Sequence, residues 1–418
     1  MRRLVRVFMT ALTVVVIAGV SSSAQPVLAQ GRQVWAYYFG WYTGDTWGDS
    51  RLTDRPANPY DSRDGGTLGR QIDEAKSSGI DAFITSWFGP KGDNLTNQNF
   101  NALLDQAAAR GFQIGASVDM QESGYNATID EVLETLRYLI NDRANHGAYL
   151  RYDGKPVIYF WNQARFSVKD WQSIRDQVDP NRNTIWVAEG TSTKFIPVFD
   201  GLYLFNTAWA ANPGAVAAQW MRNVQNAGGW FYTPTVLPGW DESRIAGRDN
   251  PTDPQARSGN DFLTRSWNGA AGSSASVILI VSWNEYFENS YIEPSQNFGA
   301  AALDTLRPLV AAWESGQAAA PPAAVTGGTE NAGAPANAPA PGTPTGITMT
   351  ITNNVRFRSA PDTNAAVLGN LAFDTTVDVV GRTADGNWIQ INYQGTSGWV
   401  SSKFGQLSDD LQKVPVTG

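Results

Sequence analysis

The stretch DAFITSWFGPKGDNLTNQNFNALLDQAAARGFQIGASVDM, residues 81–120, contains one complete strand–helix–strand repeat. Its two ends, 81–88 and 113–120, are short apolar runs with the β-branched and aromatic residues that strands favour. Between them, 99–111 has the apolar spacing of a helix and ends at Gly111, a residue type that commonly follows a helix C-terminus. A helix that joins two strands predicts a parallel pair, because parallel strands need a crossover connection.

The same alternation continues on both sides of this repeat. Further strands are predicted at 34–41, 155–162, 183–190, 200–207, 230–237 and 276–283, and further helices at 68–79, 132–142 and 212–229. Eight strands separated by crossovers predict an α/β fold, a (β/α)8 TIM barrel. An open, doubly wound sheet is the alternative, but no glycine-rich dinucleotide-binding motif follows the first strand.

The composition changes abruptly at both ends of this region. Arg2 and Arg3 precede an apolar run at 7–20 and a small-residue exit, which is typical of a signal peptide at 1–29. The alternative is a retained membrane anchor, for which the apolar run is short. We therefore expect export, to the medium or the cell surface, and no membrane association after cleavage. Downstream, 315–346 is an Ala/Pro/Gly-rich linker that follows a catalytic-sized domain at 31–314.

The region 347–408 alternates apolar and polar residues between turn signals, which predicts a small all-β domain. It resembles a bacterial SH3-like domain through NVRFRSAP (354–361), VLGNL (367–371), DGNWIQI (385–391) and GWVSSKF (398–404). The resemblance implies a role in tethering the exported protein, with a cell-wall polymer or protein as the ligand. The fold alone does not establish which ligand is bound.

The counts of cysteine and histidine exclude several kinds of metal and catalytic site. The chain has no cysteine and a single histidine, His146, which excludes thiolate metal sites and makes a histidine-based triad or zinc motif untenable. We expect no metal and no cofactor. The formal net charge of −8 becomes −11 without the signal peptide, and such a surface repels nucleic acid. An aromatic share of 11% instead suits a neutral polysaccharide or oligosaccharide, whose C–H faces pack on flat rings.

In a TIM barrel the reactive residues lie at the C-terminal ends of the strands. The predicted ends are rich in tryptophan, although any one of these rings can equally be a core residue. From them we predict a set of substrate-binding residues: Tyr38, Trp41, Trp87, Asp119, Trp161, Trp209, Trp240 and Asp241.

The last strand end, VSWNEYFENSYIEPS (281–295), has the highest density of acids. Glu285 and Glu288 reach one cleft only if the strand stops near Glu285 and the chain turns, since residues three apart on a strand face opposite sides. Two close carboxylates cannot both ionise freely, so one is expected to keep a proton near neutral pH. We predict Glu285 and Glu288 as catalytic, and Asn284, Tyr291 and Glu293 as substrate-binding.

Six segments, in the correct order, resemble glycoside hydrolase family 99, the endo-acting α-mannosidases and α-mannanases. They are FITSWFGP (83–90), GFQIGASVDM (111–120), RYDGKPVIYFW (151–161), VFDGLYLFNTAW (198–209), TPTVLPGWDESR (233–244) and SWNEYFENSYIEPS (282–295). The resemblance implies retention of configuration through a 1,2-anhydro sugar. Glu285 matches the base for the sugar 2-hydroxyl, Glu288 the acid/base, Asp119 a carboxylate near the reacting sugar, and Glu293 an orienting group.

The sequence also departs from the family pattern. Phe287 stands where the motif has His, Phe88 where it has Trp, Asn289 where it has Gly, and Met120 where it has Pro. Mannose specificity therefore does not follow from the resemblance. An α-1,3-glucanase-like hydrolase and a non-catalytic carbohydrate-binding surface protein are the alternatives.

Overall fold

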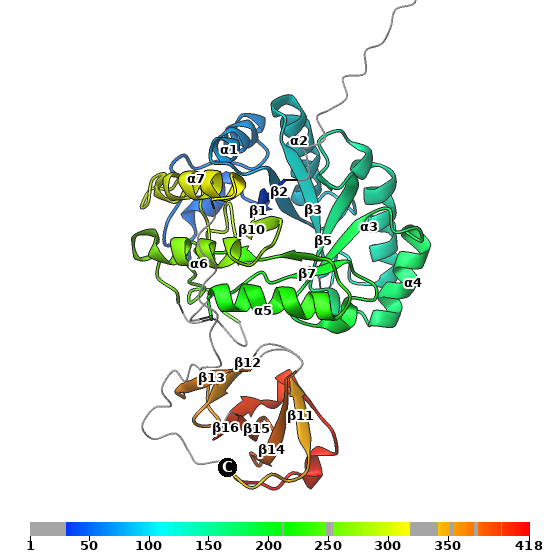
Figure 1. Cartoon of the computed structure of the whole chain (residues 1–418), viewed down its shortest axis with the longest axis vertical. Helices are drawn as coiled ribbons and strands as arrows, with labels where there is room; N and C mark the ends of the chain where they lie inside the picture. The colour runs from blue at the N-terminus through cyan, green and yellow to red at the C-terminus, as the bar shows by residue number, and fades with distance from the viewer. Residues whose placement is uncertain are drawn as a thin grey trace, which may run out of the picture.

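The computed structural model describes residues 31–317 and 342–418, except 122, 211–212, 248–251, 253, 352–354, 364, 372–374 and 394. The predicted signal peptide at 1–29 lies outside these residues, as does most of the predicted linker. The described elements form a helix-wrapped parallel barrel and a separate antiparallel domain (Figure 1).

The barrel strands follow the predicted series. They are β1 (Gln33–Phe39), β2 (Ala82–Trp87), β3 (Gln113–Asp119), β5 (Lys155–Trp161), β6 (Ile185–Glu189), β7 (Gly201–Tyr203), β8 (Phe231–Thr233), β9 (Thr235–Val236) and β10 (Val277–Ile280). They pair in the order β8-β7-β6-β5-β3-β2-β1-β10-β9, and every pair is parallel.

Pro234 explains why this order has two ends. It separates β8 from β9 and has no N–H to donate to a ladder, while its carbonyl oxygen accepts from the Leu279 amide at 3.0 Å. β8 pairs with β7 and β9 pairs with β10, so one interrupted strand closes the sheet. Counted in this way, the barrel has eight strand positions, and the predicted (β/α)8 fold is confirmed.

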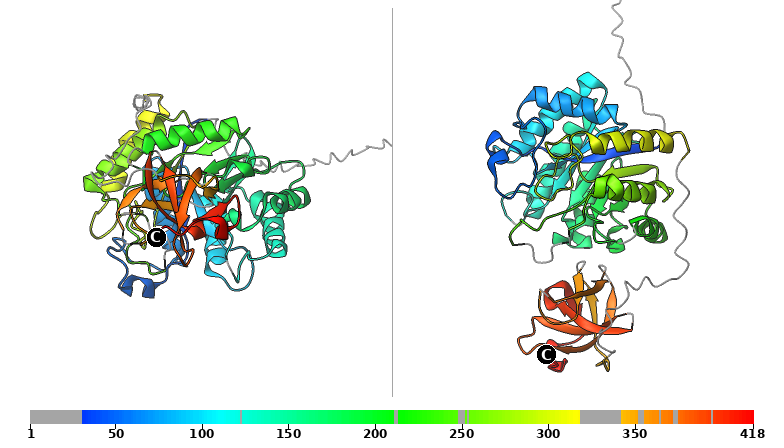
Figure 2. Two further views of the ribbon diagram at one scale, coloured as in Figure 1. Left: turned by 90° about the horizontal axis from the view of Figure 1, so that it is seen from below. Right: turned by 90° about the vertical axis from the view of Figure 1, so that its left-hand side faces the viewer.

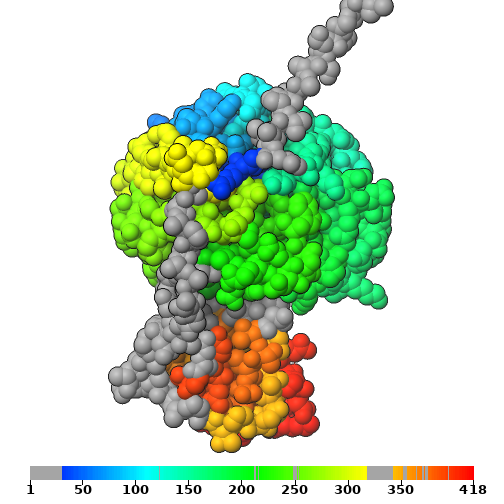
Figure 3. Space-filling view, in the orientation of Figure 1, coloured from blue at the N-terminus to red at the C-terminus, as the bar shows by residue number. Residues whose placement is uncertain are grey.

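Seven helices of the described region wrap the barrel, as Figures 1 and 2 show. They are α1 (Gly65–Ser77), α2 (Leu95–Arg110), α3 (Ile129–Asn141), α4 (Val168–Val178), α5 (Pro213–Asn226), α6 (Asp261–Ala271) and α7 (Ala301–Glu314). Asp64 and Thr128 begin α1 and α3 as N-caps that accept backbone N–H bonds. α2 ends at Gly111, as predicted, and this glycine takes the left-handed conformation with φ 61°. In the space-filling view the dark blue segment that begins the barrel lies between the yellow segment that contains α7 and the green segments further along the chain (Figure 3).

The strands are buried on both faces, which gives the domain two cores. In β1, Trp35, Tyr37 and Phe39 belong to the core inside the barrel, whereas Val34, Ala36 and Tyr38 belong to the core between barrel and helices. This alternation is the ordinary period of a strand, and apolar residues at every position are typical of parallel sheets. The helices α4, α6 and α7 were not predicted, and neither was the short strand β4 (Arg151–Tyr152), which forms an antiparallel hairpin with β5.

The second domain is all-β, as predicted, and its named strands pair in antiparallel fashion. Its strands are β11 (Thr348–Ile351), β12 (Val355–Arg358), β13 (Val367–Leu371), β14 (Thr376–Arg382), β15 (Trp388–Tyr393), β16 (Thr396–Ser401) and β17 (Gly405–Leu407), in the order β13-β12-β16-β15-β14-β11-β17. They enclose a separate apolar core that includes Met349, Phe357 and Val379. Among the described residues of the whole chain, no helix has the length and apolarity to cross a membrane.

Candidate active site

The chain turns sharply after β10, as the predicted pair of acids requires. The Glu285 amide donates to Ser282 Oγ at 2.7 Å, and the Ser290 amide returns to the Glu285 carbonyl at 3.2 Å. Asn289 takes a left-handed conformation, φ 55°, where the family motif has glycine. The turn brings Glu285 and Glu288 to one pocket instead of opposite faces of a strand.

This active-site pocket is a cavity of about 240 Å3 at the C-terminal ends of the strands. Strands β1, β2, β3 and β5 and the segments after β7, β9 and β10 contribute to it. Its lining is Tyr37, Phe39, Trp41, Ser86, Asp119, Trp161, Phe205, Ile245, Glu285, Phe287 and Glu288. Both predicted catalytic acids therefore share the pocket with three of the predicted substrate-binding residues, Trp41, Asp119 and Trp161.

The two acids are nearly covered by protein. Glu285 is 4% exposed and Glu288 is 9% exposed. Glu285 Oε1 accepts from the Phe287 amide at 2.9 Å and from the Tyr42 hydroxyl at 3.4 Å. Burial, and then the charge of Glu285, raises the pKa of Tyr42 well above its usual value, so Tyr42 remains a donor at any working pH. The two bonds hold the Glu285 carboxylate in one orientation.

Asp119 lies at the end of β3 and is 7% exposed. Burial raises its pKa to about 7, although hydrogen bonds from Gln121 and Ser86 oppose the shift. Its Oδ1 atom has no hydrogen-bond partner within the described part of the chain. A buried acid of this kind can donate to, or accept from, a hydroxyl group that enters the pocket.

A row of aromatic rings leads away from the pocket. Trp41 packs on Phe39 with ring centroids 4.5 Å apart, and stacks on Phe88 at 6.2 Å. Phe88 stacks in turn on Tyr125 at 5.6 Å, with 14° between the ring planes. These three outer rings, Trp41, Phe88 and Tyr125, are half-buried and come from the segments after β1, β2 and β3. Flat, partly exposed rings are the surfaces on which sugar faces pack.

Three residues of the loop 281–295, which we call the catalytic loop, were predicted to bind substrate but instead contact other parts of the barrel. Asn284 is buried and bonds the backbone of Phe39. Tyr291 donates to Asp54 at 2.6 Å and stacks on Tyr286, with centroids 4.1 Å apart. None of these three residues lines the pocket, because the loop folds back and turns them towards the first barrel segment.

Glu293 is the third of them, and several buried side chains donate hydrogen bonds to it. Its carboxyl group accepts from Gln71 Nε2 at 2.7 Å and from the hydroxyls of Tyr60 and Tyr286, both at 3.2 Å. Burial raises its pKa to about 7. On the other side of the loop, Arg257 Nη2 donates to the carbonyls of Asn289 and Tyr291, at 3.1 and 2.7 Å. These contacts hold the loop on two sides.

Two more predicted contacts, Tyr38 and Trp87, belong to the outer core and do not reach the pocket. The Tyr38 hydroxyl donates to Gln71 at 2.8 Å, and the Trp87 indole donates to Asn97 on α2 at 3.1 Å. Their neighbours Tyr37 and Ser86 line the pocket instead. The reason is strand alternation, since a shift of one residue moves a side chain to the other face of the sheet.

The remaining predicted contacts lie on the segments after β7 and β9, outside the pocket lining. Trp209 donates to the Asn206 carbonyl at 2.9 Å, and Trp240 packs inside the barrel core against Phe205. Asp241 caps the following turn by accepting from the Ser243 amide at 3.0 Å. Their side chains are engaged in local packing and turn formation.

Several pocket residues were not predicted. Tyr37 and Phe39 lie on the inner face of β1, two and four positions before the predicted Trp41, so the strand period counted back from Trp41 could have found them. Phe205 and Ile245 carry no such signal, because they follow strands on irregular segments whose course is set by the rest of the barrel. Glu189, at the end of β6, has its pKa raised to about 7 by burial and lies near Tyr37. In the described residues no group of three or more His, Asp or Glu side chains is placed to hold a metal ion.

The comparisons with known proteins agree with this architecture. The family model of glycosyl hydrolase family 99 matches residues 56–306, and that of the bacterial SH3 domain matches 353–406. Two structures of the GH99 endo-alpha-mannosidase from Bacteroides thetaiotaomicron, one in complex with BIS-TRIS-propane, cover 69% of this chain and 99% of their own. They align with TM-scores of 0.60 and 0.58 at 19% and 18% identity.

A third solved structure, of a glycoside hydrolase-like protein, has a TM-score of 0.51 at 14% identity and covers 66% of this chain and 93% of its own. No curated protein matches the chain. At these identities the structural likeness establishes the fold. The family model, however, matches more than half of the residues. The chain therefore belongs to glycosyl hydrolase family 99, and it is a glycoside hydrolase that carries a bacterial SH3 domain.

Proposed function

We propose that this glycoside hydrolase cleaves internal α-linked bonds of a mannan-like glycan with retention of configuration. The observation that carries the proposal is the placement of Glu285 and Glu288 on one turn, in one pocket, beside Trp41 and Trp161. The solved structures with the highest TM-scores given above are of an endo-alpha-mannosidase, which supports the same substrate class. The ring row of Trp41, Phe88 and Tyr125 suits an endo-acting enzyme, because it extends the binding surface beyond the two acids.

The mechanism that we propose has two steps, and in neither step does the sugar form a covalent bond to the enzyme. In the first step Glu285 removes the proton of the sugar 2-hydroxyl, and that oxygen attacks the anomeric carbon. Glu288 protonates the departing glycosidic oxygen as the old bond breaks, and a 1,2-anhydro sugar is formed. In the second step Glu288 takes a proton from water, the water oxygen attacks the anomeric carbon, and the 2-oxygen recovers its proton from Glu285. Two displacements at one carbon retain the configuration.

The neighbouring groups suit these roles. The Tyr42 hydroxyl and the Phe287 amide both donate to Glu285, which favours the carboxylate form that a base needs. Asp119, with its pKa raised to about 7, is available to hold a hydroxyl of the reacting sugar. In ordinary retaining enzymes the second carboxylate attacks the sugar directly. In the mechanism proposed for this enzyme, the 2-hydroxyl oxygen of the sugar attacks instead.

Phe287 distinguishes this pocket from the family motif, which has histidine at the same position. Its ring lies parallel to Tyr42, with 13° between the planes, and the Arg51 guanidinium covers it at 4.8 Å. A phenyl ring cannot hydrogen-bond a sugar hydroxyl as the motif histidine would. We propose that the sugar at this position presents a C–H face to Phe287.

A glycan panel tests the proposal. Purified protein is incubated with α-mannans and α-1,3-glucans, the products are sized, and the anomeric configuration is followed by NMR from the first minutes. We expect oligosaccharides from α-mannan with retained configuration. Early inversion would contradict the two-step mechanism, and release from α-1,3-glucan alone would contradict the substrate class. Saturable binding without any released sugar over days would identify a non-catalytic carbohydrate-binding protein.

We also propose that the chain is exported and tethered. The basic start and short apolar run within 1–29 support export, and the SH3 domain at 353–406 supports attachment to the cell wall. Cell fractionation of the full chain, beside a variant that ends at residue 317, tests both claims. We expect the full chain in the wall fraction and the truncated chain in the medium. Retention of both chains in the cytoplasm would overturn the export proposal.

A further inference from the structure

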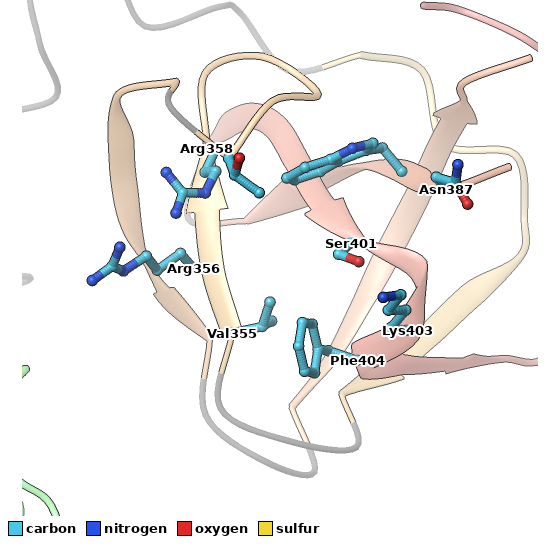
Figure 4. Close-up of a pocket in the computed structure, with 9 residues that line it drawn as sticks. Val355, Arg356, Arg358, Asn387, Ser401, Lys403 and Phe404 are labelled. Atoms are coloured by element: carbon cyan, nitrogen blue, oxygen red, sulfur yellow. The ribbon is translucent and has the colours of Figure 1, made fainter. Parts of the chain in front are cut away.

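The SH3 domain contains a pocket of its own, which we call the β12–β16 pocket, with a volume of about 380 Å3 (Figure 4). It is built between β12, the start of β15 and the turn that follows β16. Trp388 of β15 pairs with Ser401 of β16, and Arg358 of β12 pairs with Trp399. The residues that shape the pocket are thus held by two strand ladders, and the pocket exists before any ligand arrives.

The lining combines positive charge with aromatic rings. Arg356, Arg358 and Lys403 line the pocket together with Trp388 and Phe404, and none of the described lining residues is acidic. Figure 4 shows the two arginines on one side of the pocket and Lys403 and Phe404 on the other. Arg358 is only 6% exposed, and its Nη1 atom donates to the Ala365 carbonyl at 2.9 Å, which fixes the guanidinium at the pocket wall.

This concentration of charge is local. Residues 342–418 contain five Lys and Arg against six Asp, and three of the five basic residues line this one pocket. The other two lie outside the pocket lining: Arg382 donates to the Val414 carbonyl, and Lys413 pairs with Asp409 at 2.8 Å. The chain as a whole carries a net charge of −8, so a polyanion would be repelled elsewhere and attracted here.

The carboxylate of Asp385 is close in sequence to the pocket but is used within the β14–β15 turn. It accepts from the Asn387 amide at 3.0 Å and from Asn387 Nδ2 at 2.7 Å. A hydrogen bond from the Thr383 hydroxyl, together with these two from Asn387, lowers the pKa of Asp385, so Asp385 stays charged and holds Asn387 at the pocket edge.

We propose that the β12–β16 pocket binds an acidic polysaccharide, one that carries carboxylate or phosphate groups on its sugars. A sugar ring would lie against Trp388, with Asn387 and Ser401 available to its hydroxyls, while the acid group would lie between Arg358 and Lys403. Aromatic rings favour the apolar face of a sugar, and fixed cations favour its acid group. An acidic peptide would satisfy the cations but not the ring. The inference deepens the proposed tethering role of this domain, on which it rests for its biological setting.

The test measures binding of the full chain by calorimetry to defined polymers. The probes are polygalacturonate, a phosphodiester-linked hexose polymer, polygalacturonate with its carboxyl groups reduced to alcohols, and poly-L-glutamate. We expect polygalacturonate or the hexose phosphate to bind, and whichever binds more tightly identifies the acid group. The reduced polymer and poly-L-glutamate should bind at least about tenfold more weakly. Added salt should weaken the ionic contacts of the acidic glycan with the cations but not its contact with the Trp388 ring. Equal binding of either of these two probes would overturn the proposal.

Variants locate the site. Arg356→Glu, Lys403→Glu and Trp388→Ala should each weaken binding of the acidic glycan about tenfold or more, while leaving hydrolysis of a soluble oligosaccharide unchanged. Lys413→Glu alters the net charge by the same amount as the first two variants but lies outside the pocket lining, so it should bind like the parent chain. Unchanged affinity in all three pocket variants would place the ligand elsewhere and overturn the assignment.

Protein-free cell walls separate this inference from the tethering role. If the parent chain and the pocket variants bind walls equally, the pocket assignment fails and tethering stands. If the parent chain binds acidic glycan through the pocket but does not bind walls, the pocket stands and tethering fails.

Discussion

The side-chain amide of Asn284 bonds both backbone groups of Phe39. Its Oδ1 accepts from the Phe39 amide at 2.8 Å, and its Nδ2 donates to the Phe39 carbonyl at 2.8 Å and to the Tyr60 hydroxyl at 3.0 Å. The residue before the predicted base is thereby bonded to the end of the first strand. The catalytic loop and β1 form one unit, although 245 positions separate the bonded residues in the chain.

Asn284→Ala should therefore reduce both stability and activity. The change leaves the Phe39 amide and carbonyl without their buried partner, which costs about 1–3 kcal/mol in the free energy of unfolding. We expect kcat to fall because Glu285 loses its anchor. Urea unfolding and steady-state kinetics check this, with the exposed Asn145→Ala as the control. A variant with the parent's unfolding midpoint and kcat would show that the anchor is dispensable.

Replacing the two acids should give different defects. Glu288→Gln lacks the acid, so hydrolysis of a natural glycan should fall by about 10²–10⁴-fold. A glycosyl fluoride needs no protonated leaving group, so its first step should survive in Glu288→Gln but not in Glu285→Gln. Rapid-quench measurement of fluoride release from both variants tests this. A 2-deoxy glycosyl fluoride should not be turned over by the parent enzyme, and its turnover would rule out the 1,2-anhydro route.

Tyr42→Phe should move the acid limb of the pH profile of kcat/KM to higher pH. The variant loses the hydroxyl that donates to Glu285 Oε1 at 3.4 Å, and a carboxylate with one donor fewer is protonated more readily. Tyr286→Phe is the matched control, because its hydroxyl donates to Glu293 and not to Glu285. Parallel displacement of the limb in both variants would indicate a general loosening of the loop.

Asp119 should make the protein less stable as the pH rises. Its pKa of about 7 in the folded protein lies above the usual value of 3.8, so the folded state binds the proton more tightly. The free energy of unfolding then falls as the pH rises from about 4 to 7, by at most about 4 kcal/mol for this group. Asp119→Asn should remove that part of the decline and be more stable than the parent above pH 7.

Unfolding curves at pH 4.5 and 7.5 measure this effect, with Asp130→Asn at the exposed start of α3 as the control. Glu189 and Glu293, whose pKa values are also raised to about 7, should keep part of the decline in the Asp119→Asn variant. The idea is refuted if the variant and the parent lose the same free energy between the two pH values.

Two tryptophans that look alike in the sequence should respond differently to truncation. Trp87→Ala removes a fully buried ring from the outer core and should cost about 3–5 kcal/mol of stability. Trp161→Ala removes a half-buried ring from the pocket and should raise KM with a smaller effect on stability. Thermal unfolding and kinetics on a soluble oligosaccharide distinguish the two. A larger loss of stability in Trp161→Ala would contradict the placement of these rings.

Local patterns were sufficient for most of the fold. The run of strands from 34 to 283, the helix end at Gly111 and the turn after Glu285 all follow from the spacing of apolar residues and from turn chemistry. The same local signals led to the pair Glu285 and Glu288 and to the pocket residues Trp41, Asp119 and Trp161.

The structure was needed to decide which side of each strand faces the pocket. In β1 both Tyr37 and Tyr38 are buried, because helices cover one face of the barrel sheet and other strands cover the other. An apolar run carries no mark that distinguishes the two faces, so Tyr38 and Trp87 were placed one residue out of register.

The hydrogen bonds between Asn284 and Phe39 illustrate which features of the site depend on tertiary structure. The sequence by itself determined that 281–295 is an acid-rich turn at the end of the last strand, because residue type and spacing are local properties. Only the tertiary structure decided that Asn284, Tyr291 and Glu293 support this turn from behind and that Asp119 is a buried acid. Those outcomes depend on partners far away in the chain and on the burial that they create, and no local pattern encodes either.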